Sequence, residues 1–199
     1  KSFEIIEKNV NLAHFNESEK LIIKKLIHTT GDYQFADITI ISKSAIEVGI
    51  RAISENLPIV CDTMMVKSGI TSKYLKNTSC KVYSFIHYKN IIRKANKMGS
   101  TRAEAAIDFS SNKFKNAIYV IGNAPTALIR LLDLYDENKV QPSLIIAFPV
   151  GFVSAAEAKD ILARYKNLAF ITNKGPKGGS ACAATVMNGL LTLFHKSGS

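Results

Sequence analysis

The chain has 199 residues, of which 47% are hydrophobic and 21% charged, and this balance excludes a disordered or fibrous protein. Lys and Arg number 26 against 16 Asp and Glu, so the formal net charge of +10 favours an anionic partner, whether nucleic acid, an anionic membrane surface or a polycarboxylate ligand. The longest apolar runs, such as residues 144–150, are far shorter than the roughly 20 residues that a membrane-spanning helix needs. We therefore expect no transmembrane segment.

The three cysteines, Cys61, Cys80 and Cys182, form no C-x-x-C pair. We therefore expect neither a disulfide framework nor a metal site, and a cytoplasmic location fits best. The chain begins at Lys1 without Met, and no basic segment followed by an apolar run opens it, so we expect further natural residues before Lys1 and no secretion. Since no Pro/Gly/Ser-rich linker divides the chain, residues 1–199 should form a single domain.

Six short apolar runs predict strands, in chain order, at residues 38–41, 58–61, 81–86, 117–121, 143–148 and 168–172. The runs show little polar alternation, which is typical of buried strands, and segments with helical periodicity or capping signals lie between them. Strands that alternate with crossover helices lie mainly parallel, with right-handed connections. The predicted fold is therefore α/β, a three-layer sandwich with a mainly parallel sheet of about six strands and helices on both faces.

Capping boxes predict where helices start, since a first residue that can cap is followed three positions later by Glu. The four boxes begin at Asn16, Ser44, Thr101 and Ser154. Gly31 and Gly99 stand where a left-handed residue would end a helix, and Pro125 suits the first turn of a helix that runs to about Tyr135. We expect the tail from residue 195 to residue 199 to be frayed.

The loops that follow the predicted strands are candidate ligand sites, because ligands of open parallel sheets gather at the carboxyl ends of the strands. These loops are residues 62–66, 122–126, 149–153 and 174–180. The last loop combines three glycines with two lysines before an Ala-rich helix, so it could bind an anion, although a plain flexible loop explains it equally well. It matches neither common nucleotide-binding motif.

His28 ends the first long predicted helix, just before Gly31. The unpaired carbonyls of a helix C-terminus favour the imidazolium form, which suits a general acid. A structural histidine that caps the helix is the alternative, and for an isolated histidine it is the more frequent case.

Further candidates are polar residues at predicted turns and helix starts. Arg102 follows the predicted cap Thr101 in a first helical turn, where its charge opposes the helix dipole, so a carboxylate ligand there would be favourable. Asp62 follows a buried strand and could accept a hydrogen bond from a ligand or simply turn the chain. Gly122 and Asn123 lie between a strand and a helix, where turn chemistry alone would explain them.

Taken together, these segments resemble the precorrin-8X methylmutase family, which includes the cobalt-precorrin-8 methylmutases, over nearly the whole chain. IGNAPTAL at 121–128 and PVGFV at 149–153 are highly specific. The other matching segments are residues 2–6, 27–28, 61–62, 65–66, 101–102 and 177–180.

The resemblance implies an isomerase of corrin biosynthesis that moves a methyl group from C-11 to C-12 without a cofactor or a metal. It implies a homodimer with active sites at the subunit interface. His28 matches the catalytic histidine, which protonates a ring nitrogen so that the methyl group undergoes a suprafacial 1,5-shift. The positions expected to bind the substrate are Ser2, Asp62, Met65, Thr101, Arg102, Gly122, Asn123, Lys174 and Lys177. The many carboxylates of this tetrapyrrole-derived substrate then account for the basic excess, with neither nucleic acid nor membrane as a partner.

The last loop departs from the family, because an R-G-R-x-G-G-S pattern is expected and residues 174–180 read KGPKGGS. Lys and Pro in place of two Arg residues weaken bidentate recognition of a carboxylate. One alternative is a Rossmann-like protein that binds a phosphorylated ligand at this loop without methylmutase activity, and the missing phosphate motif opposes it. A nucleic-acid-binding protein is the other, opposed by dispersed Lys and Arg and by the lack of an aromatic stacking motif.

Overall fold

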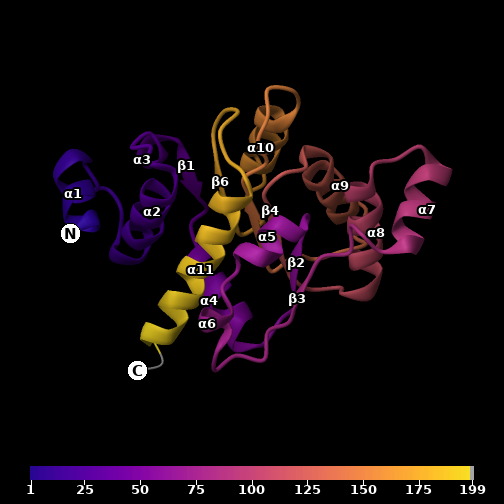
Figure 1. Cartoon of the computed structure of the whole chain (residues 1–199), viewed down its shortest axis with the longest axis horizontal. Coiled ribbons are helices and arrows are strands. Elements are labelled where there is room, and N and C mark those ends of the chain that lie inside the picture. The colour runs from indigo at the N-terminus through magenta and orange to yellow at the C-terminus, as the bar shows by residue number, and fades with distance from the viewer. Residues whose placement is uncertain (198–199) are drawn as a thin grey trace.

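The computed structural model describes residues 1–197 and is built around one six-stranded sheet (Figure 1). The strand order is β1-β6-β5-β4-β2-β3. β1 is antiparallel to β6, whereas all other neighbouring strands are parallel. The strands are β1 (Thr39–Ile41), β2 (Ile59–Cys61), β3 (Val82–Tyr83), β4 (Ile118–Ile121), β5 (Leu144–Ala147) and β6 (Phe170–Asn173). Each falls on a predicted run, and the mostly parallel α/β class is confirmed.

Helices cover both faces of this sheet, which confirms the three layers. The helices on one face are α1 (Ser2–Asn9), α2 (Glu17–Thr30), α3 (Phe35–Ile38), α4 (Ala45–Ser54), α5 (Met64–Gly69), α6 (Ser72–Leu75) and α11 (Ser180–Ser197). Those on the other face are α7 (Lys89–Met98), α8 (Arg102–Lys113), α9 (Pro125–Asp136) and α10 (Ala155–Ala163). Along β4, Ile118 and Val120 pack in the first core, while Tyr119 and Ile121 pack in the second, as the alternation of a strand requires.

The two firmest helix starts are full capping boxes at Asn16 and Thr101. Ser44 and Ser154 also precede helices, but neither side chain makes a capping hydrogen bond, so these two boxes are wrong in detail. Ser154 instead adopts a left-handed conformation, with φ of 63°. Gly31, with φ of 67°, ends α2, and the same conformation at Gly99 ends α7.

The last helix, α11, continues through Ser197, so the expected fraying is wrong for residues 195–197. The His195 ring hydrogen-bonds the Tyr74 carbonyl, with Nε2 and O 2.9 Å apart, and the Ser197 hydroxyl donates to the Leu193 carbonyl. The same expectation for residues 198–199 concerns positions outside the described residues. Within residues 1–197, no helix combines the length and the apolar content that crossing a membrane requires.

Candidate functional site

His28 lies in the last turn of α2 with its side chain exposed. The Phe3 ring approaches it edge-on, with ring centroids 6.0 Å apart and an interplanar angle of 85°. No hydrogen bond joins the imidazole to any residue of the described chain, so both ring nitrogens are available to a ligand. The carbonyl-rich end of the helix favours a positive charge at this position.

A cavity of about 260 Å³ opens beside His28. Its other lining residues are Ser2, Ile5, Ile6, Ile27, Gly31 and Tyr33. The structure thus brings Ser2 and His28, two of the predicted site residues, into one mainly apolar pocket. Ile5 and Tyr33 are about half exposed, at 49% and 46%, so the pocket has an open apolar rim.

The Asp62 carboxylate, buried just after β2, organises the loop that follows β4. Its Oδ1 accepts a hydrogen bond from the Gly122 N–H at 3.1 Å, and Oδ2 accepts from Asn123 at 2.8 Å and Ala124 at 2.9 Å. Burial raises the pKa of this carboxyl, while the N–H donors lower it. Both oxygens are therefore occupied by the backbone, and Asp62 supports the loop.

Gly122 is packed where no larger residue fits. A Cβ there would lie 2.7 Å from both the Ser180 Cα and the Val66 Cγ2. Ser180 also lies near Thr63, with hydroxyl oxygens 3.4 Å apart. The loops after β2 and β4 therefore meet the first turn of α11, and the Asn123 side chain is left exposed without a protein partner within the described residues.

Thr101 and Arg102, at the start of α8, adjoin the same loop. The Thr101 hydroxyl caps the Glu104 N–H at 3.1 Å and lies 3.1 Å from the Thr126 hydroxyl. Arg102 is exposed, and its guanidinium forms no ion pair or hydrogen bond with residues 1–197. An unpaired guanidinium at a helix start is free to bind a carboxylate.

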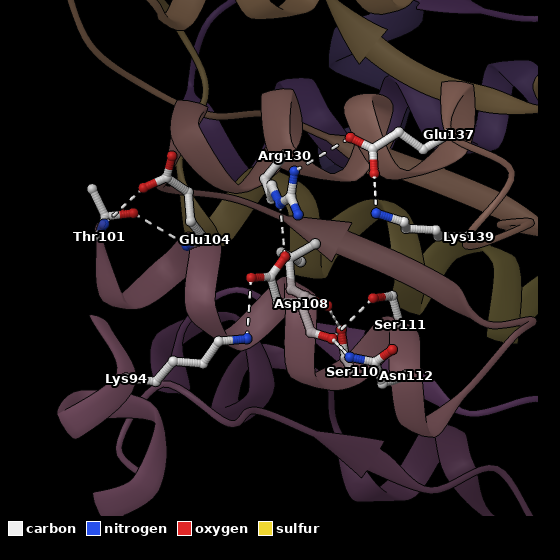
Figure 2. Close-up of polar contacts among 11 residues, drawn as sticks. Lys94, Thr101, Glu104, Asp108, Ser110, Ser111, Asn112, Arg130, Glu137 and Lys139 are labelled. Carbon is white, nitrogen blue, oxygen red and sulfur yellow. Dashed lines mark hydrogen bonds and ion pairs between the residues drawn. The ribbon is translucent and has the colours of Figure 1, made fainter. Parts of the chain in front are cut away.

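Asp108 fixes α8 against its two neighbouring helices (Figure 2). Its carboxylate lies 2.6 Å from the Arg130 Nε of α9 and 3.3 Å from the Lys94 Nζ of α7. The hydrogen bond that Arg130 donates to Asp108 raises the pKa of Arg130. Because the start of α8 carries Thr101 and Arg102, this network sets the position of both residues.

The two predicted lysines of the last loop face different surroundings. The Lys177 Nζ lies 2.5 Å from the Asp32 Oδ2 and 2.6 Å from the Gln34 Oε1, so its ammonium is already engaged. This hydrogen bond and the Gln34 N–H lower the pKa of Asp32. Lys174 has no side-chain partner in the described chain and lines a separate cavity of about 450 Å³ with His14 and other residues. The structure therefore does not place Lys174 in the His28 pocket.

The helix α11 separates the predicted residues into two groups. It packs against both α2, which carries His28, and α5, which follows Asp62 (Figure 1). The Thr29 and Thr185 hydroxyls, 2.9 Å apart, join α2 to α11. Met65, at the start of α5, is 73% exposed. The cavity beside His28 and the cavity beside Lys174 have different lining residues, and Met65 belongs to neither.

Sequence analysis missed Lys159, which is 1% exposed on α10 and bonds the Lys177 carbonyl. Its spacing gives a signal, because Lys159 lies four residues after Ala155 and three before Leu162, on the helix face that is otherwise apolar. Among residues 1–197 no cluster of three or more His, Cys, Asp or Glu side chains is placed to hold a metal ion.

The sheet, the available histidine and the loop that Asp62 holds define an α/β protein with a candidate ligand site. The family model of precorrin-8X methylmutase matches residues 1–193. The chain therefore belongs to the precorrin-8X methylmutase family, and it is an isomerase of cobalamin biosynthesis. This excludes a Rossmann-like protein that lacks methylmutase activity.

Individual relatives match this chain over at least 90% of their lengths. The chain is 38% identical to a cobalt-precorrin-8 methylmutase of Leptospira interrogans, and the match covers 100% of this chain and 93% of that protein. It is 37% identical to the corresponding Methanocaldococcus jannaschii protein, over 96% of this chain and 90% of that protein. The solved structure of precorrin-8X methylmutase from Thermus thermophilus has a TM-score of 0.91 and 30% identity, covering 99% and 95% of the two chains.

Proposed function

We propose that the protein moves a methyl group from C-11 to C-12 of precorrin-8X, or of its cobalt-containing form, with His28 as the proton donor. The observation that carries this assignment is the exposed imidazole at the end of α2, which has no hydrogen-bond partner in residues 1–197 and faces an apolar pocket. Protonation of a ring nitrogen draws electrons from the macrocycle, so the bond to C-11 breaks as the bond to C-12 forms. Any cobalt belongs to the substrate.

The carboxylates of the substrate would bind to the free cations and polar groups around this site. Arg102 and Asn123 are exposed and lack protein partners among the described residues, so they suit acetate or propionate groups. Thr101 and Asp62 have their side-chain oxygens occupied and act through the loop that they support. Lys174 would add a more diffuse attraction, because an ammonium on a flexible stem acts as a point charge.

The functional unit is proposed to be a homodimer whose second copy completes the site. Large apolar side chains are exposed shortly after β2 and β5, at 73% for Met65 in the first turn of α5, 99% for Phe152 and 81% for Val153. Large exposed apolar patches mark interaction surfaces. A second copy that covers them would also bring further side chains to the two residue groups that α11 keeps apart.

A single domain spanning residues 1–199 is proposed because both helical layers pack on one sheet. A cytoplasmic location is proposed because Cys61, Cys80 and Cys182 are all buried and free, which suits a reducing compartment.

Replacing His28 with Ala tests the assignment. The exposed ring contributes little to the fold, whereas loss of a general acid should lower turnover by roughly 10² or more. The matched control is His87→Ala, an exposed histidine two residues before α7, which should retain turnover. Figure 1 shows α7 at the opposite end of the molecule from α2. Methyl migration is followed by the absorption spectrum of the macrocycle. Near-normal turnover by His28→Ala would overturn the proposal, and an active monomer by light scattering would overturn the dimer.

A further inference from the structure

Lys159 is a buried lysine without an acidic partner. Its side chain projects from α10 into the core, where it is 1% exposed. Its Nζ lies 2.6 Å from the Lys177 carbonyl oxygen and 3.3 Å from the Asn173 Oδ1, and within residues 1–197 no carboxylate oxygen is at ion-pair distance. An ammonium without a counter-charge is costly to bury, so a residue of this kind is a candidate for a functional role.

One of the two oxygens that bind Lys159, the Lys177 carbonyl, belongs to the glycine-rich loop, residues 174–179, and the other belongs to Asn173. Asn173, which is fully buried at the end of β6, donates its Nδ2 to the carbonyls of Lys174 at 2.9 Å and Lys177 at 2.8 Å. The Lys177 carbonyl therefore accepts two hydrogen bonds, one from Lys159 and one from Asn173. Gly179 donates its N–H to the Phe148 carbonyl at 2.7 Å, which joins the loop to the end of β5.

The opposite side of this loop reaches the helix of His28. The Lys177 ammonium bonds Asp32, in the turn directly after α2. Residues 174–179 thus contact Lys159 through the Lys177 carbonyl and the turn after α2 through the Lys177 ammonium. Lys159 also adds a positive charge next to a loop that carries Lys174, whose ammonium has no partner in the described part of the chain.

We propose that Lys159 is a positioning residue of the methylmutase reaction, whose buried ammonium holds residues 174–179 in the conformation that receives a substrate carboxylate. This inference rests on the proposed function, because it takes the polycarboxylate macrocycle as the ligand. Lys159 does not touch the substrate itself. Its contribution is to binding, through the loop and the local positive potential.

The protonation of Lys159 gives the proposal a distinct signature. Burial lowers the pKa of this ammonium to about 8, while Asp160 on α10 favours the charged form. Burial also raises the pKa of the Cys182 thiol to about 11, so that thiol stays neutral as Lys159 titrates. Substrate binding should therefore weaken as the pH rises through about 8.

The test measures product affinity and turnover for wild type, Lys159→Met and Lys159→Arg across this pH range. Lys159→Met should raise KM and the product Kd by about tenfold near neutral pH, leave kcat within about twofold and abolish the alkaline weakening of binding. Lys159→Arg should restore part of the affinity. The matched control is Lys166→Met, which removes one exposed positive charge just after α10 and should leave both constants unchanged.

The outcomes separate the two proposals. Product binding that is equal in wild type and a folded Lys159→Met protein, or an alkaline limb that persists in the variant, overturns this inference alone. If the wild type fails to bind the product, the proposed function fails and the inference with it. If neither variant folds, wild-type affinity decides, because affinity that stays constant between about pH 7 and about pH 9 contradicts a role for this ammonium.

Discussion

The Lys177 ammonium lies 2.5 Å from the Asp32 carboxylate and joins the loop after β6 to the turn that ends α2. The two residues are 145 positions apart in the sequence. Lys177 was predicted to bind substrate, and in the structure it is a tether between its own loop and the turn that follows α2. Its effect on the reaction should therefore come from the geometry of this turn.

Asp32→Asn should lower turnover several-fold, because the loop is no longer tied to the His28 turn, while stability near neutral pH falls by less than about 1 kcal/mol for this partly exposed pair. Lys177 lowers the pKa of Asp32 below 3.8, so the pair stabilises the fold above that pH and loses the effect as the pH falls through the folded-state pKa. Urea unfolding of both proteins from neutral to acid pH measures this. The control is Glu17→Gln, which removes the exposed ion pair with Lys20 on α2. Equal turnover by Asp32→Asn and Glu17→Gln would contradict the tether.

Asp62→Asn should destabilise the protein by about 2–4 kcal/mol and abolish most turnover. The amide has one acceptor oxygen, so its NH₂ group would face a backbone N–H of residues 122–124 and leave it unpaired. The control is Asp133→Asn, an exposed carboxylate on α9. Chemical denaturation measures the difference, and an Asp62→Asn protein as stable as wild type would refute the role given to this carboxylate.

Arg102→Lys should weaken product binding about tenfold, although the charge is kept, because a lysine cannot form the paired hydrogen bonds of a guanidinium. The side chain is exposed and unpaired within the described chain, so stability should not change. Arg93→Lys, the same exchange at an exposed position of α7, is the control. Calorimetric titration with the product compares them, and equal affinity for wild type and Arg102→Lys would remove the proposed carboxylate contact.

The fold could be predicted because its signals are local. The apolar run that became β4 (Ile118–Ile121) and the capping boxes at Asn16 and Thr101 depend on neighbouring residues alone. Ser154 failed as a cap because the chain takes a left-handed turn there, which the sequence pattern does not register.

The site was less predictable, because its chemistry depends on which side chains already have partners. His28 and Arg102 were identified as candidates, and both are available to a ligand. Asp62 and Lys177 were predicted to bind substrate, yet each is occupied by a partner at least 60 residues away in the sequence. Lys159 was missed because its partner is a carbonyl oxygen, which any residue can offer. Long-range pairings of this kind require the folded structure.

The burial of Lys159 also predicts a gain in stability when the residue is removed. Lys159→Met replaces a buried ammonium with an apolar side chain of similar length, so the variant should be more stable than wild type by about 1–3 kcal/mol near neutral pH. The folded-state pKa of about 8 lies below the ordinary lysine value of 10.5, so between these values the unfolded chain binds more protons and the wild type gains stability as the pH rises. The advantage of the variant should therefore shrink across this window.

Urea unfolding at several pH values measures the difference in stability between wild type and Lys159→Met, with Lys166→Met as a control that should show no such trend. If the variant is more stable but binds product poorly, the buried charge is kept for substrate recognition at the expense of stability. If the variant is less stable than wild type at neutral pH, the ammonium stabilises the fold instead.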